Sequence, residues 1–233
     1  MSKKETSRAI VNLSIGTPES WYHKGRLALL ESLYNVGEKT HTFFANYERP
    51  ERKSVYEDKV AHIKHAGMYF KQILWLDCSI TAIKPLDKIW KYIEKNGVYL
   101  YQSGANCAET CNDHCLRSYG ITRDQAALIP ECASNVVGIN LEHEVGKKFF
   151  DLWIGSLETG AMVGEKWPSL TQRLGESLDK RFKYHRQDQS TASLSAWLAG
   201  AKLEREGHFV VRAENLSIKS KDTCLVLKGG VGE

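Results

Sequence analysis

A short apolar run that ends in a carboxylate constrains the fold of this chain most strongly. Residues 73–76 read Ile-Leu-Trp-Leu, and Asp77, Cys78 and Ser79 follow directly. A continuous apolar run of this length, bounded by polar residues, is typical of a strand buried on both faces. Ligands of open α/β sheets bind where the carboxyl ends of the strands lie. Asp77 is therefore expected to face a ligand, and the alternative is that it caps the turn.

Strand and helix patterns alternate along the first 80 residues. β-rich segments at residues 9–15 and 40–46 alternate with helical apolar spacing over residues 18–34 and 54–70. A β-α-β-α-β order predicts an α/β fold with a mostly parallel central sheet flanked by helices. Further helices are expected over residues 86–95, 144–157 and 190–203, and further strands over residues 98–102, 134–140 and 209–212.

The composition is that of an ordinary globular protein. The 233 residues are 42% hydrophobic and 26% charged, and no run approaches the roughly 20 apolar residues of a membrane span. The N-terminus lacks the apolar core of a secretory signal, so we expect a cytoplasmic protein with reduced cysteines. A net charge of +4 permits a polyanionic partner without requiring one.

The chain shows no internal repeat and no low-complexity linker. We expect one domain over residues 1–216. Residues 217–233 are basic and then Gly-rich, and are expected to form a poorly ordered C-terminal tail.

A second polar constellation lies at residues 184–190, which read Tyr-His-Arg-Gln-Asp-Gln-Ser. On a helix, His185, Asp188 and Gln189 would share one face. An imidazole, a carboxylate and an amide could supply a metal ligand, an acid or base, and a partner for sugar hydroxyls. The alternative is a polar helix start, in which Asp188 interacts favourably with the helix dipole.

Three other features could contribute to a phosphate site around Asp77. Mg²⁺ or Mn²⁺ takes oxygen ligands from carboxylates and phosphates, and could neutralise a departing diphosphate. Lys59, in the helix before the central strand, could contact a phosphate or carboxylate, although most helix lysines are solvated. The turn at Gly16 and Thr17 follows the first strand and could cradle a nucleotide, although Walker and dinucleotide fingerprints are absent.

Cysteines 107, 111 and 115 recur every four residues, with His114 beside the last. Three thiols and an imidazole could bind zinc. The spacing departs from the two ligand pairs that are usual in structural zinc sites. The alternative is that these cysteines are free and reduced.

Taken together, these segments resemble the GT-A class of nucleotide-sugar glycosyltransferases. Residues 74–80 are similar to the strand of that class that ends in an Asp-x-Asp motif, and residues 185–190 to a His-x-x-Asp-Gln-Ser segment. The similarity covers roughly residues 9–201 and extends to bacterial and phage glycosyltransferase-like proteins. Intervening segments with matching order are 84–86, 112–113, 120–122 and 136–140.

The resemblance implies a GT-A-like fold with a Rossmann-like nucleotide-binding half, and it implies roles for individual residues. Asp77 and His185 would bind Mn²⁺ or Mg²⁺ on the diphosphate. Asp188 would be the catalytic carboxylate. The remaining donor-binding residues would be Ser14, Gly16, Thr17, Lys59, Ser79 and Gln189. Ser79 departs from the class pattern because it stands where the second Asp is expected, so the cation could be replaced by Arg or Lys side chains.

The resemblance also implies the reaction, a hexosyl or pentosyl transfer from a nucleotide diphosphate sugar, first of all a UDP-sugar, to a hydroxyl. One acceptor is a hydroxymethylated pyrimidine in phage duplex DNA, which would place the enzyme in the host cytoplasm. The other is a cell-surface polysaccharide or a lipid-linked acceptor. Inversion and retention are both compatible with these residues. The alternative to an enzyme is a non-catalytic protein that binds a nucleotide or a carbohydrate.

Overall fold

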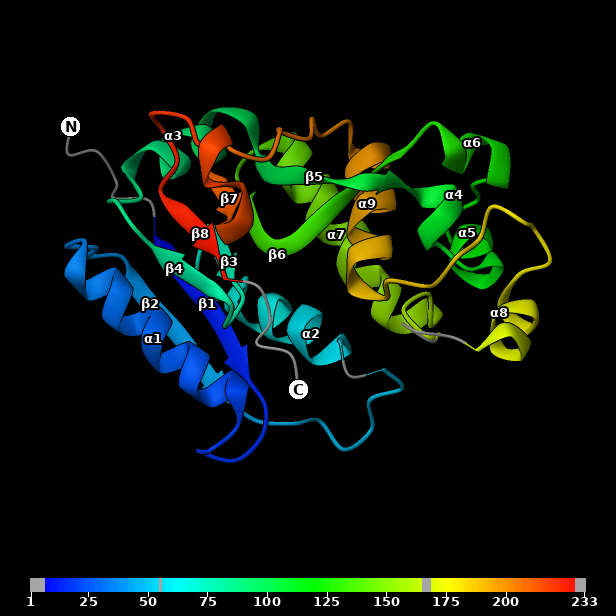
Figure 1. Cartoon of the computed structure of the whole chain (residues 1–233), viewed down its shortest axis with the longest axis horizontal. Helices are drawn as coiled ribbons and strands as arrows, with labels where there is room; N and C mark the ends of the chain where they lie inside the picture. The colour runs from blue at the N-terminus through cyan, green and yellow to red at the C-terminus, as the bar shows by residue number, and fades with distance from the viewer. Residues whose placement is uncertain (1–6, 55, 165–168, 229–233) are drawn as a thin grey trace.

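The computed structural model describes residues 7–54, 56–164 and 169–228. Its core is a five-stranded sheet in the order β2-β1-β3-β6-β5 (Figure 1). β1 pairs in parallel with β2 and β3, and β6 runs antiparallel to both β3 and β5. Four of the five strands therefore point the same way, which confirms the mostly parallel sheet. The strands are β1 Arg8–Ser14, β2 His41–Asn46, β3 Gln72–Leu76, β5 Val98–Asn106 and β6 Pro130–Asn140.

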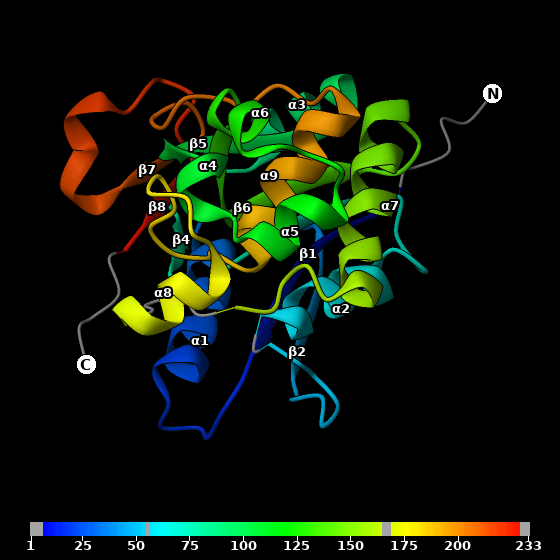
Figure 2. The same cartoon turned by 90° about the vertical axis from the view of Figure 1, so that its right-hand side faces the viewer.

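Helices cover both faces of this sheet. Apolar residues of α2, α7 and α9 pack on one face, and those of α1 and α3 pack on the other. Shorter helices α4, α5 and α6 surround a third apolar cluster, and they lie beside α9 in both views (Figure 1, Figure 2). The helices are α1 Trp21–Asn35, α2 Glu57–Ala66, α3 Asp87–Asn96, α4 Cys107–Thr110, α5 Asp113–Ser118, α6 Arg123–Ala127, α7 Glu144–Thr159, α8 Leu170–Glu176 and α9 Asp188–Ala199.

The apolar run at residues 73–76 is buried on both faces, as its sequence predicts. All five residues of β3 are buried, and successive side chains point to opposite sides of the sheet. Trp75 packs with α2, α7 and α9, whereas Leu74 and Leu76 pack with α1 and α3. The strand is central, with β1 on one side and β6 on the other. Its carboxyl end therefore holds Asp77 between two neighbouring strands.

The prediction of a poorly ordered tail is wrong for residues 217–228. A 3₁₀ helix, Ala213–Ile218, leads to β8, Leu225–Leu227, which pairs with β4, Ile80–Ala82, and with β7, Val210–Arg212. Composition suggested disorder, but Leu225 is fully buried in the cluster beneath α1 and α3. The strands of this second sheet have three residues each, too few for a periodic signal. Residues 229–233 lie outside the described residues.

Two expected boundaries also shift. α2 begins at Glu57 rather than at residue 54, and α9 begins at Asp188 rather than at residue 190. β5 also extends to Asn106, beyond its expected end at residue 102, and helix α4 follows it directly. Within the described ranges, no helix is long and apolar enough to cross a lipid bilayer.

Leu225→Ala should lower the free energy of unfolding by about 2–5 kcal/mol, because it opens a cavity where β8 meets the core. Urea denaturation of the variant and the parent measures this. Leu178→Ala is the matched control, since Leu178 is 81% exposed. A Leu225→Ala variant as stable as the control would mean that the second sheet does not stabilise the fold.

Candidate active site

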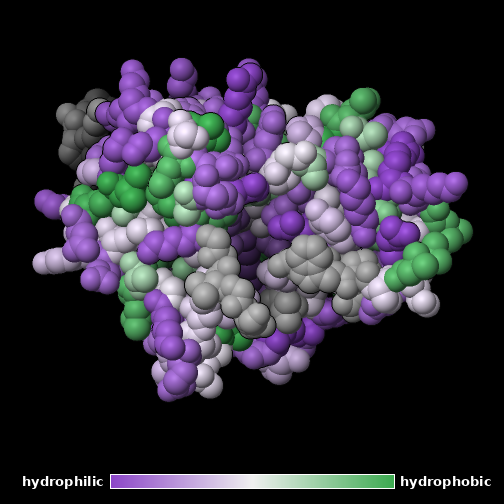
Figure 3. All heavy atoms as spheres, in the orientation of Figure 1, coloured by the Kyte–Doolittle hydropathy of each residue, from purple (hydrophilic) through white to green (hydrophobic). Residues whose placement is uncertain are grey.

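A cavity of about 570 Å³ opens at the carboxyl ends of β1 and β3. This size is within the range of small-molecule binding sites. The face shown in Figure 3 is hollowed near its centre, and hydrophilic side chains lie in the hollow. The described lining residues are Leu13, Ile15, Trp21, Tyr22, Arg52, Tyr56, Lys59, Trp75, Asp77, Cys78, Ser79, Ser134, Asn135, Arg186, Gln187, Asp188, Gln189, Leu227 and Lys228.

Asp77 emerges from the end of β3 at one side of this cavity. Its backbone N–H donates to the carbonyl of Asn135 on β6 at 2.9 Å, which fixes the turn after the strand. Its carboxylate Oδ1 accepts a hydrogen bond from Trp75 Nε1 at 2.5 Å. The Asp77 side chain is 35% exposed, so it is accessible to a ligand as well as held in place.

Asp188 reaches the same cavity as the first residue of α9. Its carboxylate is 5% exposed, and Oδ2 accepts a hydrogen bond from Ser134 Oγ at 2.8 Å. As an acidic residue in the first turn of α9, it also interacts favourably with the helix dipole. Gln187, which precedes it, has φ 43° and ψ −110°, a conformation that costs energy for a non-glycine residue. This turn sets the direction of α9, and Asp188 therefore lies opposite Asp77.

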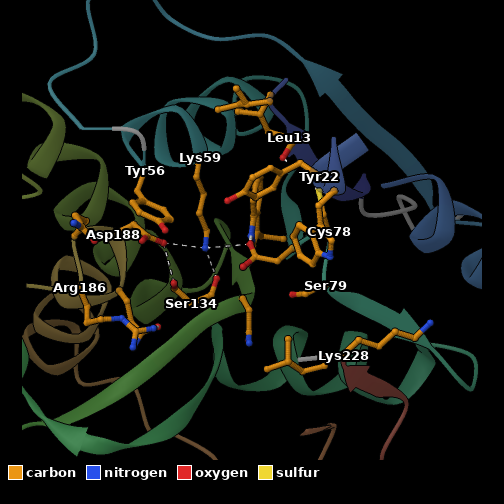
Figure 4. Close-up of a pocket in the computed structure, with 18 of the residues that line it drawn as sticks. Leu13, Tyr22, Tyr56, Lys59, Cys78, Ser79, Ser134, Arg186, Asp188 and Lys228 are labelled. Carbon is orange, nitrogen blue, oxygen red and sulfur yellow. Dashed lines mark hydrogen bonds and ion pairs between the residues drawn. The ribbon is translucent and has the colours of Figure 1, made fainter. Parts of the chain in front are cut away.

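Lys59 joins the two carboxylates. Its Nζ lies 2.9 Å from Asp188 Oδ2 and 3.4 Å from Asp77 Oδ1, and it also donates to the carbonyl of Ser134 (Figure 4). The side chain is 9% exposed. Burial alone would lower the pKa of Lys59, but the carboxylates of Asp188 and Asp77 outweigh it and hold that pKa above its ordinary value. The group is therefore a buried cation between two acids.

The shared helical face expected for His185, Asp188 and Gln189 is wrong. α9 begins only at Asp188, so His185 lies in the preceding segment, which is not helical. His185 is fully buried outside the described cavity lining. Its Nε2 pairs with the carbonyl of Ala161 at 3.1 Å, and its Nδ1 accepts from the N–H of Asn112 at 3.4 Å. Both ring nitrogens are thus committed to the backbone, which leaves none for the predicted metal.

Gln189 lines the cavity, and its role in binding a ligand stays a prediction. Its Oε1 accepts a hydrogen bond from Arg186 Nη2 at 3.1 Å. Within the described chain, its Nε2 and the Oε1 of Glu131 are both buried without a hydrogen bond of good geometry. Burial raises the pKa of Glu131, while Ser103 and Gln189 oppose that shift. Glu131 is buried and is not among the described lining residues of the cavity.

The turn after β1 contributes less than expected. Ser14 is buried, and Gly16 and Thr17 are exposed. Among the described residues, Ile15 of this turn lines the cavity, and these three do not. Gly16 has φ 112°, which favours glycine there. Their predicted role in nucleotide binding stays a prediction.

Ser79 lines the cavity beside Asp77, and the segment after β8 lies against it. The Ser79 carbonyl accepts from the N–H of Lys228 at 2.9 Å. Lys228 and Arg186 also line the cavity, and no sequence pattern pointed to either cation. Arg186 lies within the polar segment 184–190, and Lys228 lies in the C-terminal stretch that composition predicts to be poorly ordered.

The three cysteines of the possible zinc site lie together in the apolar cluster of α4–α6. Cys107, Cys111 and Cys115 are fully buried, and all six cysteines of the chain are free thiols. The described part of the chain contains no group of three or more His, Cys, Asp or Glu side chains placed to hold a metal ion. Packing among apolar neighbours accounts for these thiols.

No protein-family model and no curated protein sequence matches this chain. Solved structures do match. The bifunctional glycosyltransferase WbbM is similar with a TM-score of 0.56 and 8% identity, over 100% of this chain and 47% of that chain. Mouse xyloside xylosyltransferase 1 is similar with a TM-score of 0.52 and 10% identity, over 95% and 97% of the two chains.

These similarities show the fold alone, and they confirm the GT-A-like architecture that the resemblance implied. This chain spans about half of the WbbM chain, so WbbM contains a large part with no counterpart here.

Lys59→Met should lower the free energy of unfolding at pH 7 by roughly 3–5 kcal/mol, because it leaves the buried Asp188 carboxylate without its cation. The double variant Lys59→Met/Asp188→Asn should recover most of that loss, since neither residue is then charged. Urea denaturation of both variants and the parent checks this. A double variant no more stable than Lys59→Met would show that the ion pair is not what the lysine contributes.

Buried imidazoles predict a loss of stability in mild acid. Burial lowers the pKa of His62 and of His185 below 6.5. The unfolded chain therefore takes up protons that the folded chain does not, and the free energy of unfolding falls as the pH drops below 6.5. Urea midpoints between pH 7.5 and 5.5 measure the slope. His62→Gln should flatten it and the exposed control His114→Gln should not; equal slopes in all three proteins would contradict this origin.

Proposed function

We propose that this protein is a glycosyltransferase that moves a hexosyl or pentosyl group from a nucleotide diphosphate sugar to an acceptor hydroxyl. The observation that carries the proposal is the Asp77–Lys59–Asp188 bridge at the ligand edge of the sheet. Support also comes from the GT-A-like fold, in which solved neighbours are named as glycosyltransferases. The cavity is large enough for a nucleotide sugar to occupy at least in part.

The reaction makes two electrostatic demands on this site. The bond between the anomeric carbon and the diphosphate breaks, which leaves negative charge on the diphosphate and positive charge on the sugar. Preorganised groups of opposite sign stabilise both charges. Asp188 is the proposed catalytic carboxylate, oriented by Ser134 and Lys59 toward the sugar. Asp77 lies across the cavity, and Gln189 would contact sugar hydroxyls.

The acceptor hydroxyl passes its proton to the Asp188 carboxylate as its oxygen bonds to the anomeric carbon. A hydroxymethylated pyrimidine in duplex DNA is one proposed acceptor, and it would have to leave the base stack to reach the cavity. The net charge of +4 is compatible with that partner. A polysaccharide or lipid-linked acceptor is the other proposal. Binding to duplex DNA that weakens steeply with salt would favour the first.

A non-catalytic nucleotide- or carbohydrate-binding protein is the second candidate. Ser79 in place of the expected carboxylate favours it. Turnover distinguishes the two, since a binding protein would retain a nucleotide sugar without cleaving it.

Asp188→Asn should reduce turnover of nucleotide sugars by roughly 10²–10⁴-fold, the range for loss of a positioned acid or base. The amide keeps the shape and can still bind Ser134, so the fold should persist. The assay follows release of nucleoside diphosphate from UDP- and GDP-sugars, with and without Mn²⁺. Asp151→Asn is the control, because that carboxylate is exposed on α7. Full activity in Asp188→Asn would contradict the assignment, and no turnover by the parent would favour the binding protein.

A further inference from the structure

We infer that this site holds the donor diphosphate with arginine and lysine side chains rather than with a divalent cation. The inference rests on the proposed function and concerns how the same cavity recognises its ligand. The predicted metal ligands were Asp77 and His185, with Ser79 at the position of a second acid. The donor atoms that these residues offer decide whether Mn²⁺ or Mg²⁺ fits.

The donor set does not fit a hard divalent cation. Such a cation takes oxygen ligands, usually including one or two carboxylates. His185 is buried against the backbone, and Ser79 offers only a neutral hydroxyl. Asp77 Oδ1 already accepts from Trp75 and lies beside Lys59. Among the described lining residues, Asp77 is therefore the one carboxylate that is exposed enough to contact a metal.

The second lining carboxylate is also engaged. Asp188 Oδ2 accepts from Ser134 and pairs with Lys59. The Lys59 ammonium, 2.9 Å and 3.4 Å from the two carboxylates, takes the place between the acids where a bridging cation would be attracted. A metal ion there would be repelled by that ammonium at short range.

The remaining charge of the lining suits an anion. Four basic residues, Arg52, Lys59, Arg186 and Lys228, face two acids, Asp77 and Asp188, across the described lining. Arg52 is paired with Glu48 and Asp58 outside the cavity. Lys59 offsets one of the two acids. Arg186 and Lys228 therefore leave the lining net positive even when Arg52 is discounted.

Arg186 and Lys228 are placed at different sides of the cavity. Arg186 precedes α9, and one of its five N–H donors is used among the described residues, for Gln189 Oε1. Lys228 follows β8 and is held beside the turn after β3 by its backbone bond to Ser79 (Figure 4). Arginine binds phosphate oxygens in a fork, and lysine binds them as a point charge. The Lys228 ammonium points away from Lys59 in Figure 4, so it reaches a diphosphate only when its exposed side chain turns inward. Arg186 and Lys228 would then together supply the positive charge that a metal would otherwise give.

Isothermal titration of UDP and GDP, in EDTA and separately in Mn²⁺, tests this inference. At least one nucleotide should bind with the same affinity in both buffers, and its affinity should fall as salt rises. Arg186→Ala and Lys228→Ala should each weaken binding by roughly tenfold or more, as expected for loss of a hydrogen bond between charged groups. The control Lys221→Ala changes an exposed lysine outside the described lining and should bind like the parent.

Ser79→Asp provides a reciprocal test. The added carboxylate should weaken binding in EDTA and make it respond to Mn²⁺. Thermal unfolding of each variant separates loss of a contact from loss of the fold. Binding by the parent only in Mn²⁺, or unchanged binding in both alanine variants, would overturn the inference and leave the proposed function standing. Absence of nucleotide binding in both buffers would overturn both.

Discussion

One buried ammonium holds this site together. Lys59 comes from α2, and its partners come from the end of β3, from β6 and from the start of α9. Burying a carboxylate without a partner is costly, so Asp188 at 5% exposure depends on this cation. The same contact fixes the separation of the two acids. The consecutive elements α2 and β3 therefore meet the remote elements β6 and α9 at one point, and the cavity forms around it.

Local sequence signals predicted one half of this site well. The apolar run before Asp77 could only be buried, and the alternation of strands and helices placed its end at the ligand edge. Asp188 reaches the same cavity, but not on the helical face that the sequence predicts. The helical face that was to unite it with His185 does not exist, since a strained turn at Gln187 starts the helix after the histidine. Backbone strain of this kind leaves no mark in residue periodicity.

The other half depends on contacts between remote segments. Nothing near Lys59 in the sequence indicates that its ammonium pairs with Asp188, more than half the chain away. Lys228 was missed because composition favours disorder in a basic and Gly-rich stretch. Three-residue strands that pair with β4 and bury Leu225 outweigh that composition. The second sheet is what brings a lysine to the turn after β3.

The most direct test is a thermal-shift screen of nucleotide sugars in the presence of EDTA. A ligand that binds only the folded state raises the apparent melting temperature by mass action. If the cavity around Asp77, Lys59 and Asp188 is a nucleotide-sugar site of net positive charge, at least one nucleotide sugar will raise the apparent melting temperature without any added metal. A complete panel of UDP- and GDP-sugars that leaves the melting temperature unchanged, with EDTA and with Mn²⁺, would contradict that conclusion.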